Sequence, residues 1–327
     1  MAFRFRLREP IVKDFRRIGA EQIERALGQL SAGVDIPKEV HEARKCLKRV
    51  RALLRLGREG LGEEVFQAEN TRFRTIAGRL SSARDDHVVI ETLVQLEATA
   101  DDDEARAALR RARAAILQTR TAEDTAGRAV DPATLSEVQA ELTCALEGFR
   151  DLKLSPKGAP TLVAGLVRVY RRGRKGLLTA YATGNDEDFH TLRKAVQAHW
   201  RHMALLTRLW PQMFSARVEA ARELSQILGD DHDLALLKTR IAALDAEALS
   251  DVENDALLAL ISARQHMLRR LAKPRGIMLF AAPAKAHGRW IAALWDAAVA
   301  KAKLDSEAEK AGYPRASSSK KQAFSRS

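Results

Sequence analysis

The feature that most constrains the fold of this chain is a basic helical motif that occurs twice. The pattern H-x-x-R-K begins at His41 in "VHEARKCLKRV" and again at His190 in "FHTLRKAVQAH", at an offset of 149 residues. A second pair of segments, "LSSARDDHVV" and "LGDDHDLALL", brings Asp85 onto Asp233 at an offset of 148. Two blocks that keep register to within one residue indicate an internal duplication. They predict two similar helical bundles related by a pseudo-two-fold axis.

The composition predicts an all-α protein. Ala, Leu, Arg and Glu dominate, only 5% of the residues are aromatic, and β-branched residues are sparse, so helix is favoured throughout. The only strand-like pattern is the alternation of apolar and basic residues in "AFRFRLRE" near the N-terminus. We predict helices at 10–31, 37–57, 62–81, 84–98, 102–125, 133–149, 160–183, 185–209, 214–228, 232–247, 251–273 and 284–304.

Domain boundaries follow from breaks in this pattern. The segment "LKLSPKGAPT" at 152–161 is rich in Pro, Gly and Ser. We predict that it links a first helical half, residues 1–151, to a second helical half, residues 162–304. The final segment, 305–327, includes "YPRASSSKKQAFSRS" with no periodicity, and it is predicted to be a disordered basic tail.

Several kinds of protein are disfavoured by the same features. No apolar run approaches the ~18 residues of a membrane helix, and the N-terminus lacks the apolar region of a secretory signal. The two cysteines, Cys46 and Cys144, form no C-x-x-C motif, which argues against a zinc site and suits a reducing cytoplasm. We therefore expect a cytoplasmic protein with no membrane partner, metal or cofactor. The sequence leaves the oligomeric state open.

The charge balance is the strongest functional signal. Lys and Arg number 55 against 43 Asp and Glu, a formal net charge of +12. Such a field attracts polyanions, for example nucleic acid, an anionic membrane surface or a phosphate polymer. At helical spacing, the basic residues of the first motif form one stripe about 120° wide, with no acid inside it. The stripe consists of His41, Arg44, Lys45, Lys48, Arg51 and Arg55.

The second motif repeats this stripe with His190, Arg193, Lys194 and Arg201. An ordinary solvated helix face mixes signs, whereas like charges three or four residues apart repel by about 0.2–0.5 kcal/mol per pair. A repulsion that is present in both copies therefore predicts an anionic partner. Further basic residues stand in "NTRFR" and "RVYRRGRK", and of the latter we expect Arg171 and Arg174 to extend the site.

The order of these motifs resembles the CHAD domain, the conserved histidine α-helical domain, over about residues 5–300. The resemblance rests on H-x-x-R-K-x-x-K from His41, H-x-x-R-K from His190, "ARD" at 83–85 and "LGDDHD" at 228–233. It implies two similar helical bundles around a basic groove or pore that binds inorganic polyphosphate, with the basic residues of both motifs lining it. It also implies an association with polyphosphate granules.

The chain departs from the family pattern in the second motif, at Gln197 and in "AHWRH" at 198–202, and the motif of a frequent companion domain does not occur in it. Gln197 stands where a Lys is expected, so the second half presents less charge there. Many CHAD domains follow a triphosphate-processing CYTH domain, but its E-x-E-x-K motif does not occur in this chain. We therefore expect a binding protein and not an enzyme.

The motif histidines predict a pH dependence. If His41 and His190 face phosphate groups, each gains a positive charge as the pH falls through its ordinary pKa range. Tighter polyphosphate binding is therefore expected at about pH 6 than at about pH 8.

Two alternative functions stay open. The clusters "RDDH" at 84–87 and "DDHD" at 230–233 are compatible with a metal-dependent phosphohydrolase, because His and Asp are common metal ligands. We expect instead that Asp85 and Asp233 accept hydrogen bonds from the basic helices and orient their side chains. A general polyanion-binding or nucleic-acid-binding protein is the other alternative. The scarcity of aromatic residues on which bases could stack disfavours nucleic acid.

Overall fold

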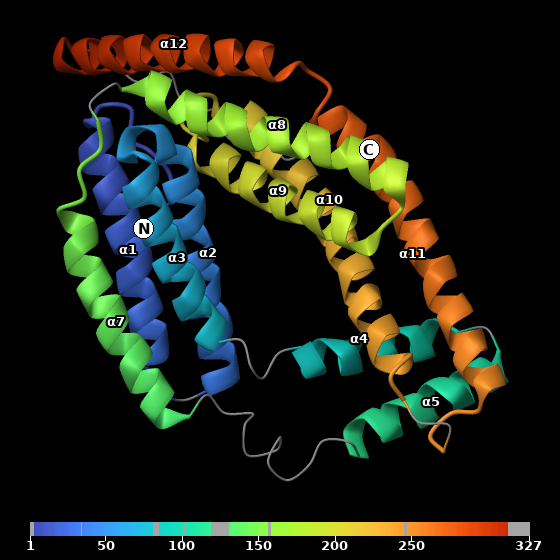
Figure 1. Cartoon of the computed structure of the whole chain (residues 1–327). Helices are drawn as coiled ribbons and strands as arrows, with labels where there is room; N and C mark the ends of the chain where they lie inside the picture. Colours follow the sequence, from blue (N-terminus) through green and yellow to red (C-terminus); the bar gives the residue numbers. More distant parts are fainter. Residues whose placement is uncertain are drawn as a thin grey trace, which may run out of the picture.

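The computed structural model describes residues 3–33, 35–80, 85–100, 102–118, 131–155, 158–244 and 247–312, and of residues 85–87 only the backbone. Every regular element within these ranges is an α-helix (Figure 1). The prediction of an all-α protein is thus confirmed. The helices are α1 (Ile11–Leu30), α2 (Ile36–Leu61), α3 (Glu63–Arg79), α4 (Asp85–Thr99), α5 (Asp103–Gln118), α7 (Pro132–Arg150), α8 (Ala159–Thr183), α9 (Asp186–Leu205), α10 (Pro211–Ile241), α11 (Asp251–Leu279) and α12 (Ala284–Lys310).

One predicted break between helices is wrong. The sequence predicts separate helices at 214–228 and 232–247, but α10 runs without interruption through "LGDDHD". A glycine inside a helix costs only about 1 kcal/mol relative to alanine, and packing easily offsets that amount. A Cβ at Gly229 would lie 3.5 Å from the guanidinium of Arg193. This arginine of the second motif therefore packs directly on the turn where the break was predicted.

Two helices extend beyond their predicted ends. α11 passes through Pro274 and continues to Leu279, because the fixed φ of proline is helical and this residue lies on the exposed side, where a missing N–H costs least. α12 continues to Lys310, so residues 305–310 are helical, contrary to the predicted disordered tail. Residues 311–312 form a turn, and the remaining part of that predicted tail, 313–327, lies outside the described residues.

The strand-like alternation near the N-terminus forms no strand within the described residues 3–8. The side chain of Phe5 is buried and packs edge-on against Trp295, with 6.0 Å between the ring centroids. The Phe5 N–H donates to the Leu205 carbonyl at 2.9 Å. The buried carboxylate of Asp14 accepts hydrogen bonds from the Arg6 N–H and from the Arg17 guanidinium. The alternating pattern therefore reflects one buried face of an irregular segment, not strand pairing.

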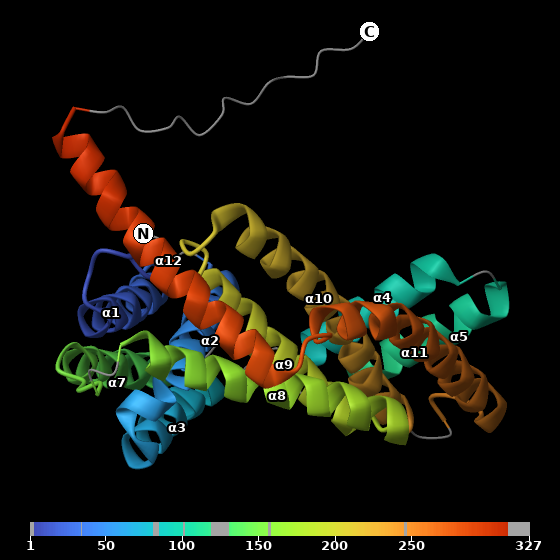
Figure 2. The same cartoon turned by 90° about the horizontal axis from the view of Figure 1, so that it is seen from above.

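Three apolar clusters hold the helices together. The largest joins α1, α2, α3 and α7 and includes side chains of α12 and of the adjacent ends of α8, α9 and α10. A second cluster lies between α8, α9, α10 and α11. α4 and α5 pack on α10 and α11, away from the helices that precede them in the chain (Figures 1 and 2). The duplication stays a prediction, and the packing shows that α4 and α5 complete the bundle formed by the C-terminal helices.

The connection from α7 to α8 is fixed to α2. The Ser155 N–H donates to the Gly60 carbonyl at 2.8 Å, and the side chain of Leu154 is buried. α8 then crosses α2 at very short range. A Cβ at Gly165 would lie 2.7 Å from the Arg55 carbonyl oxygen and closer still to that of Leu56. The two backbones therefore touch at this point, directly beside a residue of the first basic stripe.

We predict that Gly165→Ala destabilises the protein by at least about 2 kcal/mol, because the new methyl group has only rigid backbone to displace. Gly176→Ala on the same helix is the matched control. Its Cβ would lie 3.5 Å from the nearest atom, so the change should be neutral or stabilise by up to about 1 kcal/mol. Urea unfolding followed by circular dichroism measures both variants. Equal effects of the two substitutions would contradict the close crossing of α2 and α8.

Candidate functional site

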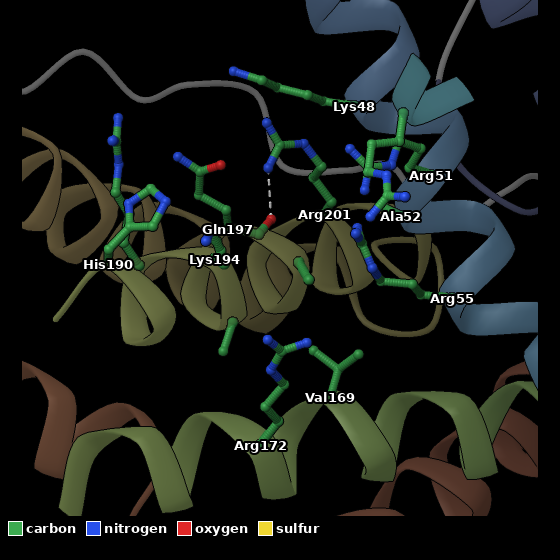
Figure 3. A pocket seen from close by; sticks show the side chains of 14 residues that line it. Lys48, Arg51, Ala52, Arg55, Val169, Arg172, His190, Lys194, Gln197 and Arg201 are labelled. Carbon is green, nitrogen blue, oxygen red and sulfur yellow. Dashed lines mark hydrogen bonds between the residues drawn. The ribbon is translucent and has the colours of Figure 1, made fainter. Parts of the chain in front are cut away.

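A cationic pocket lies where α2, α8 and α9 meet, with a volume of about 520 Å³. Figure 3 shows side chains of α2, α8 and α9 directed toward this space. Its polar lining residues are Lys48, Arg51, Arg55, Arg74, Arg172, His190, Arg193, Lys194, Gln197 and Arg201, and its apolar lining residues are Ala52, Val169, Ala195 and Ala198. We call this set the cationic pocket.

Among the described residues, no Asp or Glu lines the pocket. Neutral hydrogen-bond partners hold part of it in place: Arg51 Nε donates to Asn70 Oδ1 at 3.2 Å. Lys194 lies 3.6 Å from Glu187, whose side chain is 79% exposed, and an exposed pair of this kind contributes about 0–1 kcal/mol. The positive charge of the pocket is therefore largely uncompensated by the lining residues themselves.

The helix arrangement makes the cations perturb one another. Burial lowers the pKa of Arg55 to about 10, with the charges of Arg51 and Arg172 acting in the same direction. Burial also lowers the pKa of Arg51, with a contribution from Arg74. Each shift has the sign expected when a positive charge is removed from water and placed near others. An anion in the pocket would reverse both effects.

Arg201 is the most buried cation of the pocket, with 8% of its surface exposed. Burial, together with the charges of Arg49, Arg55 and Arg222, lowers its pKa to about 9. Its guanidinium donates from Nη1 to the Gln197 carbonyl at 2.7 Å and lies 4.3 Å from the centroid of the Trp200 ring. These neutral contacts fix the orientation of the side chain but do not neutralise its charge.

His202, one residue further, joins α9 to α2. Its imidazole is fully buried, and burial lowers its pKa to about 3. The ring is therefore neutral, and its Nε2 lies 2.9 Å from the Ala52 carbonyl, to which it donates. Ala52 itself lines the cationic pocket. A neutral histidine thus holds the two basic helices at a fixed separation.

His190 lies at the opposite end of the α9 lining from Arg201. Its ring stacks on that of His232 with 3.9 Å between the centroids. Burial lowers the pKa of His190, and the charges of Lys194 and Arg193 lower it further. The same causes, with His190 itself contributing, lower the pKa of His232 to about 4. Neither imidazole is a ready cation at neutral pH while the pocket is free.

Comparison with known proteins shows the family and the fold of the chain. The family model for the CHAD domain matches residues 17–242, which is more than half of the chain. The chain belongs to the CHAD domain family. The structure of PptA from Streptomyces chartreusis is similar in fold, with a TM-score of 0.55 and 15% sequence identity over 83% of this chain and 100% of that chain. A search of curated proteins finds no match.

The structure places seven of the predicted site residues of this CHAD protein together. Those that line the cationic pocket are Lys48, Arg51, Arg55, His190, Arg193, Lys194 and Arg201. The lining thus draws on both copies of the H-x-x-R-K motif. The remaining predicted cations, His41, Arg44, Lys45, Arg171 and Arg174, are not among the lining residues.

Local contacts explain most of these exclusions. Arg44 Nη1 donates to the Leu80 carbonyl at 3.5 Å, and Lys45 Nζ donates to Glu42 at 2.7 Å. Arg174 donates to the carbonyls of residues 280–282 in the turn before α12. Arg171 is exposed on α8. His41 lies two turns before Lys48, the first residue of α2 to reach the pocket.

Two cations of the pocket, Arg74 and Arg172, were not predicted as site residues. Both lie in segments whose basic character is evident in the sequence, "NTRFR" and "RVYRRGRK". The helical period alone does not show which side of α8 faces α2. The sequence therefore could not identify Arg172, and not its basic neighbours, as a residue that lines the pocket. The contact of Gly165 with the α2 backbone, seven residues earlier, is what fixes that face.

The predicted orienting carboxylates are only partly described. The side chain of Asp85 lies outside the described residues, and Asp233 is half-buried on α10. The buried carboxylate of the "DDHD" segment is Asp231, which accepts a hydrogen bond at 2.7 Å from Arg269 on α11. Arg269 also pairs with Asp186 at the start of α9. This network ties α9, α10 and α11 together behind the pocket.

The described residues give little support to the hypothesis of a metal-dependent phosphohydrolase. Within the described ranges, no group of three or more His, Cys, Asp or Glu side chains is placed to hold a metal ion. No helix in the same part of the chain is both long enough and apolar enough to cross a membrane. The chemistry that the site presents is therefore that of concentrated, partly desolvated guanidinium and ammonium groups.

We predict that Arg201→Met raises the free energy of unfolding of the ligand-free protein by about 1–3 kcal/mol, because it removes a buried charge and keeps apolar volume. At pH 7 the lowered pKa still leaves Arg201 protonated, so the full penalty is present. Arg289→Met on the exposed face of α12 is the control and should change stability by less than about 0.5 kcal/mol. Urea unfolding at low salt gives both values. A loss of stability in Arg201→Met would contradict an uncompensated cation.

Proposed function

We propose that this CHAD protein binds inorganic polyphosphate in the cationic pocket. The observation that carries the proposal is the composition of the lining, in which the described residues include eight Lys and Arg residues and one His and no Asp or Glu. Charge-assisted hydrogen bonds to phosphate oxygens are the interaction that such a lining provides best. Family membership supports the same ligand, because the CHAD motifs that imply polyphosphate binding are the ones that meet here.

Polyphosphate fits the pocket better than nucleic acid does. Single-stranded nucleic acid is generally held by a basic groove together with aromatic side chains on which bases stack. In the part of the chain that the structure describes, no Phe, Tyr or Trp lines the cationic pocket. A ligand that consists only of linked phosphates needs no such platform.

We infer that the protein binds the polymer without cleaving it. Phosphoryl transfer requires a positioned nucleophile or metal ion in addition to charge stabilisation. The buried acid of the "DDHD" segment, Asp231, is engaged by Arg269. Incubation of the protein with polyphosphate and Mg²⁺ should leave the chain length unchanged on a gel, whereas shortening would identify a hydrolase.

The cellular role that follows is association with polyphosphate granules in the cytoplasm. A fluorescent fusion should co-localise with granules. It should become diffuse when the lining arginines are replaced.

The decisive binding variant uses two neighbouring arginines of α8. Arg172 lines the pocket and Arg171 does not. Arg172→Ser should weaken polyphosphate binding about ten-fold, since a charge-assisted contact contributes about 1.5–3 kcal/mol. Arg171→Ser carries the same change in net charge and should weaken binding less than about two-fold. Calorimetric titration at fixed salt measures both. Equal losses would mean that the polymer responds to overall charge and not to the pocket.

Competition separates the polyphosphate proposal from general polyanion binding. Single-stranded DNA of equal total charge should displace bound polyphosphate only at a large excess. If the two ligands compete equally, the protein is a general polyanion binder. Salt dependence does not distinguish them, because both ligands release counterions on binding.

The position of His190 predicts a pH dependence shifted to lower pH than that of an ordinary histidine. Its pKa in the free protein is lowered from 6.5, and a bound polyanion raises it by favouring the imidazolium. Affinity therefore increases as pH falls and stops increasing below the free-state pKa. We expect a larger gain from about pH 7 to 5 than from about pH 8 to 7, measured by calorimetry.

His190→Gln should flatten this profile, and His266→Gln, at an exposed position on α11, should leave it unchanged. Identical profiles for wild type and His190→Gln would remove His190 from the binding site.

A further inference from the structure

We propose that the anion-binding surface continues out of the cationic pocket, past Arg201 and the indole of Trp200, to Arg49 on α2 and Arg222 on α10, and that this extension engages long polyphosphate chains. The inference rests on the proposed function, because it names a further part of the surface for the same ligand. Neither Arg49, Trp200 nor Arg222 lines the pocket itself. We call Arg49 and Arg222 the arginine extension.

Trp200 connects the pocket with Arg222. The guanidinium of Arg201, a lining residue, lies 4.3 Å from the centroid of the Trp200 ring, and that of Arg222 lies 4.9 Å from the same ring. An indole in contact with two guanidinium groups holds both at short range without neutralising either, since the attraction comes from the ring quadrupole. The cationic surface therefore does not end at Arg201.

Arg49 extends the surface along α2. It directly follows Lys48, a lining residue, but its guanidinium points to a different set of neighbours. It donates to Gln22 Oε1 at 3.3 Å and lies 6.0 Å from the Phe3 ring. Both partners are uncharged. The charges of Arg49 and Arg222 contribute to the lowered pKa of Arg201, which is consistent with three guanidinium groups close together.

Two carboxylates near the extension, Glu42 and Glu223, are engaged by other cations. The Glu42 carboxylate accepts a hydrogen bond from Lys45 at 2.7 Å. This bond lowers the pKa of Glu42, and the charge of Arg49 lowers it further. Glu223, next to Arg222 in the sequence, pairs with Arg275 at 2.7 Å. Among the described residues, Arg222 has no carboxylate within ion-pair distance, and it is exposed. The extension thus keeps net positive charge at the protein surface.

Because the pocket is short, only long polyphosphate chains are expected to reach the arginine extension. Along α9 the lining runs from His190 to Arg201, which is about 16 Å at 1.5 Å per residue. A triphosphate can be held entirely within this length, whereas a long polymer must leave the pocket. At the Arg201 end it meets Arg222 and Arg49.

The test compares two ligands on matched double variants. Arg49→Ser with Arg222→Ser should weaken the binding of long-chain polyphosphate about ten-fold and make its salt dependence shallower, because phosphate contacts are lost. Triphosphate affinity should stay within about two-fold of the wild type. The control, Arg270→Ser with Arg289→Ser, removes the same charge from exposed positions of α11 and α12 and should leave both affinities nearly unchanged. Arg222→Ser alone should give an intermediate loss for the long chain only.

Two results would overturn the inference while leaving the proposed function intact. In the first, the extension variant binds long-chain polyphosphate as tightly as the control variant does. In the second, the extension variant loses triphosphate and long chain equally, which would mean that the substitutions distort the pocket. A wild-type protein that binds neither ligand would refute the proposed function itself.

Discussion

The structure depends on one unfavourable interaction, the mutual repulsion of arginine side chains that the fold holds out of water. Arg55 and Arg201 have pKa values lowered to about 10 and about 9, and the described residues that line the pocket around them include no Asp or Glu. An isolated buried charge ordinarily costs several kcal/mol. Such a cost persists in a stable protein when the rest of the fold over-determines the geometry and a ligand can relieve it.

Uncharged contacts around the pocket hold the three helices that carry these arginines in fixed positions. α8 touches the α2 backbone at Gly165, which positions Arg55 and Arg172 on facing helices. The neutral imidazole of His202 donates to the Ala52 carbonyl and sets the distance from α9 to α2. The three apolar clusters then prevent the helices from separating. Binding energy from an anion is thus not needed to organise the site, so little of it is lost on ordering side chains.

The sequence was most informative where periodicity and charge coincide. The two H-x-x-R-K segments predicted helices and a stripe on each, and Arg51, Arg55, Arg193 and Arg201 do meet in one pocket. The helical period of a sequence predicts which residues share a face of the helix. It does not predict which turn of that face contacts the partner helix. Hence Arg44 and Lys45, on the correct stripe of α2, lie outside the pocket. Arg171 and Arg174, which were predicted to extend the site, do not line the pocket for a related reason, because the orientation of α8 is set by a glycine contact.

Tertiary contacts also decided the elements that sequence reasoning misjudged. Gly229 did not end a helix, since α10 is packed along its length and by Arg193 at that turn. The alternation at the N-terminus produced no strand, because Asp14 and Leu205 supply the hydrogen-bond partners of that segment. The packing of α4 and α5 on α10 and α11 is not encoded in any local pattern.

The measurement that tests this account most directly is thermal unfolding of the wild-type protein with and without long-chain polyphosphate at matched ionic strength. A ligand that neutralises a repulsive pocket in the folded state stabilises that state by mass action. We therefore expect Tm to rise by several degrees and to level off as the polyphosphate concentration increases. Sodium chloride that supplies the same concentration of negative charge should not raise Tm to the same extent. An unchanged or lowered Tm would show that the arginines of the pocket do not bind a phosphate polymer in the folded protein.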